Sequence, residues 1–109
     1  MTYKEISEMI ASVGVPTAYY QFPEDTPQAP PFICFFYSNS DDVFADGINY
    51  QKILQLNIEL YVSEKDFALE ASIEDVLTAN ELTYYKEESY IDSEKLYQIA
   101  YEMEVMING

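Results

Sequence analysis

The sequence contains no arginine, no histidine and no tryptophan, and its only basic side chains are 5 lysines. Without arginine, it lacks the planar bidentate group that most often clamps phosphates and carboxylates. Without histidine, it lacks the usual proton-transfer group at neutral pH and the commonest imidazole metal ligand. The lysines are outnumbered by 20 aspartates and glutamates, which gives a net charge of −15. Phosphate electrostatics therefore disfavour tight binding to nucleic acid or to an anionic membrane surface.

Cysteine, glycine and long apolar runs are also scarce. Cys34 is the single cysteine and lies in the apolar run 32–37, so we expect a buried, reduced thiol, as in a reducing cytoplasm. The 3 glycines are too far apart to form a glycine-rich phosphate loop. No apolar run approaches the length of a membrane span, and Glu5 and Glu8 interrupt the N-terminal segment. We expect neither a membrane span nor a signal peptide.

The carboxylates are the remaining candidates for chemistry. With 20 of them in 109 residues, neighbouring pairs such as Glu87 and Glu88 arise by chance and favour a solvated face over a hydrolytic dyad. Asp41, Asp42 and Asp46 lie close together, but they do not have EF-hand spacing, and Asp is a typical turn residue. Weak calcium binding at this loop is the alternative interpretation. We expect no enzyme activity, no cofactor and no dedicated metal site.

Two stretches alternate apolar and polar residues, which predicts long strands with one buried face. In residues 51–62 the apolar positions are Leu54, Leu56, Ile58, Leu60 and Val62, and the opposite face carries Gln55, Asn57, Glu59 and Tyr61. In residues 96–107 the apolar positions are Tyr97, Ile99, Tyr101, Met103, Val105 and Ile107. Shorter strands are expected at 17–21, 32–37 and 82–88, with a turn at 89–94. The four prolines within residues 22–31 predict an irregular connection.

Two other segments repeat apolar residues at helical spacing. The first follows Thr2 and Glu5, which have capping-box spacing, and its apolar positions are Ile6, Met9, Ile10 and Val13. The second is expected to begin at Ser63 and to end near Asn80. Its expected sheet-facing positions are Phe67, Leu69, Ile73, Val76 and Leu77, and its expected solvent-facing positions are Glu64, Glu70, Glu74 and Asp75.

The Asp46-Gly47 pair between apolar residues is a strong hairpin signal. It predicts a long β-hairpin around residues 43–50, whose tip projects beyond the core. Together, the predicted helices and strands indicate a single α+β domain over residues 1–109 with the order α-β-β-β-α-β-β. We expect a two-layer sandwich, in which two helices cover one face of a mixed, mostly antiparallel sheet.

The 11 tyrosines exceed what a small core requires. They are compatible with a tyrosine-lined protein interface, although strand propensity alone accounts for many of them. The expected interaction site is the hairpin, and its candidate residues are Val43, Phe44, Asp46, Ile48 and Tyr50.

Taken over nearly its full length, the chain resembles the small minor tail or tail-completion (tail terminator) proteins of long-tailed phages and prophages of Gram-positive bacteria. The segments that carry the resemblance are AYYQFP at 18–23, PPFI at 30–33, DVFAD at 42–46, NY at 49–50, IELY at 58–61, YKEESYI at 85–91 and YQIAY at 97–101. They are not a catalytic signature.

The resemblance implies a non-enzymatic structural protein that forms a ring of six subunits at the head-proximal end of the tail tube. Such a protein stops tube growth and joins the tail to the head, and its isolated subunits can be monomeric. The implied partners are other copies of the chain, the tail tube protein and head-tail connector proteins. The implied location is the host bacterial cytoplasm during virion assembly and then the tail. A head-tail connector or adaptor component, and a small acidic cytoplasmic protein-binding module, are the alternatives.

Overall fold

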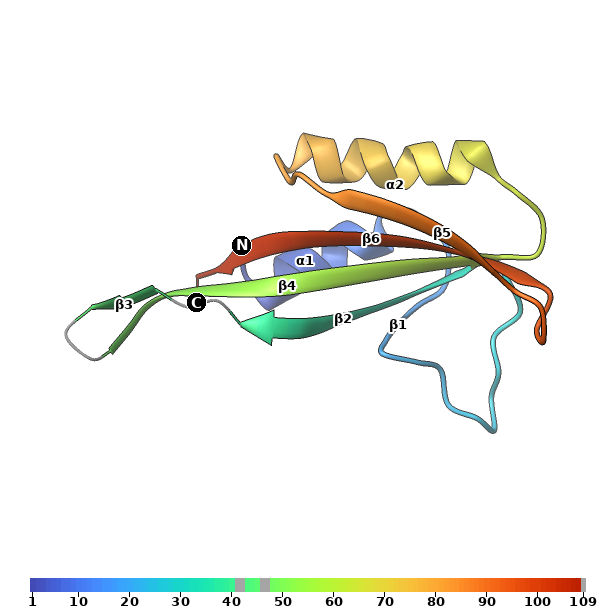
Figure 1. Ribbon diagram of the computed structural model, residues 1–109, viewed down its shortest axis with the longest axis horizontal. Helices are drawn as coiled ribbons and strands as arrows, with labels where there is room; N and C mark the ends of the chain where they lie inside the picture. The colour runs from blue at the N-terminus through green and yellow to red at the C-terminus, as the bar shows by residue number, and fades with distance from the viewer. Residues whose placement is uncertain (41–42, 46–47, 109) are drawn as a thin grey trace.

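The computed structural model describes residues 1–40, 43–45 and 48–108, and for residues 43–45 and 48–51 the description covers the backbone. Helices and strands follow one another in the order α1 (Tyr3–Ala11), β1 (Thr17–Tyr19), β2 (Phe32–Ser40), β3 (Val43–Ala45), β4 (Ile48–Val62), α2 (Phe67–Ala79), β5 (Tyr85–Ile91) and β6 (Leu96–Ile107). Figure 1 shows these elements in a view with the longest axis horizontal. The α+β class expected from the sequence is confirmed.

The sheet has the strand order β1-β2-β4-β6-β5, and β3 pairs with β4 outside this path. Only β1 and β2 run parallel, so the sheet is mixed and mostly antiparallel, as predicted. The central pair is β4 and β6, aligned from Lys52 opposite Ile107 to Val62 opposite Tyr97. The strand predicted at 32–37 is longer than expected, because β2 continues to Ser40 with a register shift between Tyr37 and Ser40. Both β2 and β3 pair with β4.

The core lies between one face of the sheet and the two helices. The buried apolar residues of β4 and β6 are those that the alternation predicted, and they meet Ile6, Met9 and Ile10 of α1 and Ile73 and Leu77 of α2. The first turn of α1 is held by the predicted capping box. The Thr2 hydroxyl accepts a hydrogen bond from the Glu5 amide at 3.1 Å, and the Glu5 carboxylate accepts one from the Thr2 amide at 2.8 Å.

The predicted start of α2 is wrong. The helix begins at Phe67 rather than at Ser63, because Asp66 is its N-cap and accepts a hydrogen bond from the Leu69 amide at 3.0 Å. Residues 63–66 instead carry the chain from the end of β4 to the helix layer. The ring of Phe67 is consequently 73% exposed and does not face the sheet.

The fifth and first strands also differ from their predicted bounds. β5 covers Tyr85–Ile91 rather than 82–88, and the turn that follows it covers residues 92–95. Nearly every residue of β5 is exposed, so no alternation marks this strand in the sequence. β1 ends at Tyr19, because Tyr20 has a φ of 71° and turns the chain away from the sheet.

The hairpin of β3 and the start of β4 extends beyond the ends of the neighbouring strands (Figure 1). The two chain ends lie together near its base. The N-terminal ammonium group donates a hydrogen bond to the carbonyl of Met106 at 2.8 Å, and the Asn108 amide donates one to the carbonyl of Met1 at 3.0 Å. The overall extents are 50 × 31 × 22 Å, and the projecting hairpin contributes to the longest of them.

Candidate functional site

The hairpin that carries the predicted interaction residues forms at the expected place. Phe44 pairs with Asn49, Ala45 pairs with Ile48, and the register shifts between Phe44 and Val43. The backbone therefore brings Val43, Phe44, Ile48 and Tyr50 into one two-stranded arm. Asp46 lies outside the described residues, and so does the candidate calcium loop of Asp41, Asp42 and Asp46 as a whole.

The face of the sheet opposite the helices is polar and acidic over its centre. Gln55, Asn57 and Glu59 of β4 lie beside Glu104, Glu102 and Ala100 of β6, respectively. Direct hydrogen bonds connect several of these side chains. The Gln55 amide donates to Glu102 at 2.7 Å, and the Asn57 amide donates to the Ser38 hydroxyl at 2.8 Å. We call this the open face.

Two adjoining hollows lie on the open face and along its β5 side. One has a volume of about 650 Å³, and the other has a volume of about 540 Å³. Both are lined by Tyr85 and Glu102, so they form one trough across β5, β6 and β4. The lining also includes Glu81, Glu104, Glu59 and Glu87. Lys86 lines the second hollow as well, but its ammonium group is held on the helix side by Glu70 and Glu74. An acidic trough of this kind repels phosphates and attracts cationic groups.

Aromatic rings cover the β2 side of the same face. The rings of Phe32 and Tyr61 are stacked with their centroids 5.0 Å apart, and Phe22 from the proline-rich connection packs edge-on against Phe32 at 5.4 Å. Burial raises the pKa of Tyr61 to about 12; the hydrogen bond from Gln98 opposes that shift, and the nearby Glu59 carboxylate adds to it. Tyr61 is therefore a neutral phenol at physiological pH.

Cys34 is only 4% exposed, as expected for a buried thiol. Its register partner on β4 is Glu59, which places the cysteine on the open-face side of the sheet. Burial raises the pKa of the thiol, and the Glu59 carboxylate raises it further. A thiol held in its protonated form is a poor nucleophile.

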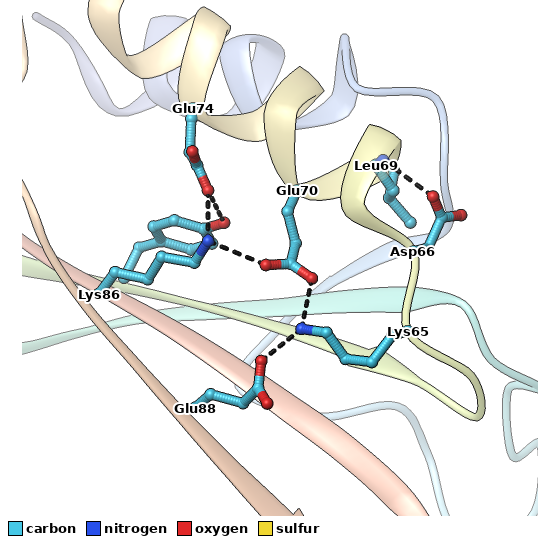
Figure 2. Close-up of polar contacts among 8 residues, drawn as sticks. Lys65, Asp66, Leu69, Glu70, Glu74, Lys86 and Glu88 are labelled. Carbon is cyan, nitrogen blue, oxygen red and sulfur yellow. Dashed lines mark hydrogen bonds and ion pairs between the residues drawn. The ribbon is translucent and has the colours of Figure 1, made fainter.

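A network of charged side chains fastens α2 to the β5 side of the sheet (Figure 2). Glu70 accepts from Lys65 at 2.6 Å and from Lys86 at 2.9 Å. Lys86 also binds Glu74 at 2.7 Å, and Lys65 also binds Glu88. The network therefore joins the loop before α2, the helix itself and β5.

This network corrects the prediction that Glu70 and Glu74 face solvent. Glu70 is only 3% exposed, and Glu74 accepts a hydrogen bond from the buried hydroxyl of Tyr101 at 2.8 Å. Glu70 precedes Ile73 by three residues and Leu77 by seven, so it lies on the same helical stripe as the core residues. The spacing could have revealed its position, but a carboxylate is rarely placed in a core stripe unless it is paired.

The lysines set the ionisation of these carboxylates. Burial alone would raise the pKa of Glu70, but the hydrogen bonds from Lys65 and Lys86 outweigh it and hold the pKa below its ordinary value. The hydrogen bond from Lys86 likewise lowers the pKa of Glu74 and outweighs its partial burial. The same contacts raise the pKa of Lys86. Glu70 and Glu74 are consequently held in their charged forms by the lysines, and the network is a structural clamp.

No family model matches the chain, and no curated protein matches it significantly. Within the described residues, no helix is long and apolar enough to cross a membrane. The same part of the chain holds no group of three or more acidic or cysteine side chains arranged to bind a metal ion.

Proposed function

We propose that the chain is a non-enzymatic structural protein of a long-tailed phage or prophage, which caps the head-proximal end of the tail tube and takes part in head-tail joining. The projecting hairpin is the observation that carries the proposal. The backbone of this two-stranded arm extends beyond the ends of the neighbouring strands, and an isolated hairpin is marginally stable in water. Such an arm is suited to insertion between neighbouring subunits or into the end of a tube.

The positions of the resembling segments support the same assignment. DVFAD and NY fall on the hairpin, AYYQFP covers the end of β1 and the start of the proline-rich connection, and YKEESYI is the whole of β5. These three segments lie at the arm and at the two edges of the sheet, where contacts between subunits can form without rearranging the core, whereas IELY and YQIAY lie on the central strands β4 and β6. A ring, with six subunits as the family resemblance suggests, would use these edges repeatedly.

The acidic composition also agrees with this role. DNA passing through a tail must slide without adhering, and a net charge of −15 with no arginine disfavours phosphate binding. The proposed partners are other copies of the chain, the tail tube protein and a head-tail connector.

Deleting residues 42–49 from the gene in its phage, with a two-residue turn closing the gap, tests the proposal. The arm-deleted protein should keep its circular dichroism spectrum, whereas tails should fail to join heads or should vary in length by electron microscopy. A matched control is Asp75→Asn, an exposed change on α2 that leaves the arm intact. Normal tails joined to heads, made with a folded arm-deleted protein, would contradict the assignment.

Affinity purification of the tagged protein from assembling particles distinguishes the alternatives. Tail tubes should accompany the protein if it caps the tail. Recovery of portal complexes without tubes would favour a connector component instead. A stable complex with a host protein, and no virion association, would favour an acidic binding module.

A further inference from the structure

Strand β5 is a bare edge of the sheet. It pairs with β6 and with no other described strand, so one side of its seven-residue backbone is unpaired. Natural edges are usually covered, bulged or very short, because exposed amides and carbonyls can accept another strand. The opposite edge is protected in these ways: β1 covers part of β2, the Tyr19 hydroxyl accepts from the Tyr37 amide at 3.3 Å, and the register shifts after Tyr37.

The side chains of β5 divide between two environments. Lys86 and Glu88 point to the helix side, where the clamp beneath α2 already holds them. Tyr85 and Glu87 lie on the open face, opposite Glu102 and Ala100 of β6. The ring of Tyr85 is 83% exposed, so it offers an aromatic surface at the margin of the trough.

The charge on the open face has no internal counterpart. Glu59, Glu87, Glu102 and Glu104 line the trough, and none of them forms an ion pair with another described residue. By register, the two lysines of the described strands fall on the helix side. Lys52 lies opposite Ile107, and Lys86 lies opposite Tyr101.

We propose that the β5 edge and the acidic trough beside it bind an extended segment of another protein that carries lysine or arginine at alternate positions. The segment would add to the sheet through main-chain hydrogen bonds, which is the β-augmentation mode. Its basic side chains would lie next to Glu87 and would reach Glu102, about 10 Å or two strand spacings away. Its other side chains would face the clamp and be neutral. This inference stands whether or not the protein belongs to a phage tail.

A second copy of the chain is the wrong occupant on charge grounds. No described strand carries more than one lysine, and β5 itself contains Glu87 and Glu88. Lys86 of β5 is already held by Glu70 and Glu74, so pairing two β5 edges would bring their Glu87 carboxylates together without a β5 lysine to offset them. The occupant is therefore a different, basic chain.

A fluorescent seven-residue peptide that alternates lysine with threonine or valine is a suitable probe. Fluorescence anisotropy should show binding of this peptide. The affinity should fall as salt is raised from 50 to 300 mM, because salt screens the charge contacts. The same peptide with glutamate in place of lysine should not bind. N-methylation of alternate peptide amides along one edge should weaken binding at least about tenfold, because it removes main-chain donors.

Variants of the protein test whether the peptide binds at the β5 edge and the trough. The double variant Glu87→Gln and Glu102→Gln should bind the lysine peptide about tenfold more weakly, and hydrogen exchange should show new protection of β5 amides when the wild type binds. The matched double variant Glu8→Gln and Glu24→Gln removes the same charge from α1 and the proline-rich connection, and should bind as the wild type does.

Three results with the peptides and variants would overturn the inference. The first is no binding of the lysine peptide at millimolar concentration, and the second is equal weakening in the two double variants. The third is binding that N-methylation leaves unchanged. Sedimentation of the protein alone is a further check, because self-association that protects β5 amides would make a second copy the occupant and the inference wrong.

Discussion

Replacing Glu70 by glutamine tests whether the clamp beneath α2 stabilises the fold. The substitution keeps the size of the side chain and one oxygen acceptor, but it removes the charge that lies 2.6 Å from Lys65 and 2.9 Å from Lys86. Each lysine keeps one carboxylate partner, Glu88 or Glu74. The variant therefore weakens the clamp without leaving either ammonium group unpaired.

The size of the effect follows from these contacts. Removing one partner of a buried ion pair costs roughly 3–5 kcal/mol when the remaining charge has no other partner. Here both lysines are partly exposed and doubly paired, so we expect about 2 kcal/mol, close to the value of one or two charge-assisted hydrogen bonds. For a domain of this size, that loss lowers the Tm by about 8 °C.

The effect should depend on pH with a definite sign. The folded-state pKa of Glu70 lies below its ordinary value of 4.5, so the carboxylate contributes stability above that value and loses it as pH falls through the lowered pKa. The difference in unfolding free energy between wild type and Glu70→Gln should therefore be full at pH 7 and should shrink as pH falls below 4.5.

Urea denaturation followed by circular dichroism at pH 7 and pH 3.5 measures this difference. Asp75→Asn is the matched control, since it removes an exposed carboxylate from the same helix and should change stability by less than about 0.5 kcal/mol. The reasoning would be refuted by a Glu70→Gln variant as stable as this control at pH 7, or by a gap of the same size at both pH values.

Two further substitutions and one labelling experiment test other parts of the fold. Tyr101→Phe removes the hydroxyl that donates to Glu74 at 2.8 Å while keeping the buried ring, and it should lower the unfolding free energy by about 1.5 kcal/mol; an unchanged denaturation midpoint would argue against that hydrogen bond. Leu56→Ala empties a fully buried site on the central strand, and calorimetry should show a loss of about 3 kcal/mol; a loss below 1 kcal/mol would mean that the core collapses around the site. The Cys34 thiol should react with a maleimide far more slowly in native protein than in urea, because it is buried and its pKa is raised; equal rates would contradict its placement.

The sequence predicts well the strands that have one solvent-exposed face and one buried face. Apolar and polar residues alternate in 54–62 and 96–107, because successive side chains of β4 and β6 point alternately to the core and to the open face. The hairpin was predictable for a different reason, since Asp46-Gly47 is a local turn signal that needs no knowledge of the core.

The remaining features depend on neighbours that are distant in the sequence. β5 has no alternation because it is an edge strand with both faces exposed, and its bounds are set by pairing with β6. The burial of Glu70 depends on Lys86, which reaches it from β5, and on Lys65, which reaches it from the loop before α2. Pairing with those two lysines offsets the cost of burying the Glu70 carboxylate beneath the helix.

The placement of the lysines connects the stability of the fold to its proposed binding surface. Two of the 5 lysines, Lys65 and Lys86, neutralise carboxylates between α2 and the sheet, where unpaired charge would be most costly. The described strands bring no lysine to the open face, so repulsion among its carboxylates is relieved there only by solvent and counterions. A single lysine opposite Glu102 would reduce that repulsion, and a basic strand added at the bare β5 edge would supply the same compensation from outside.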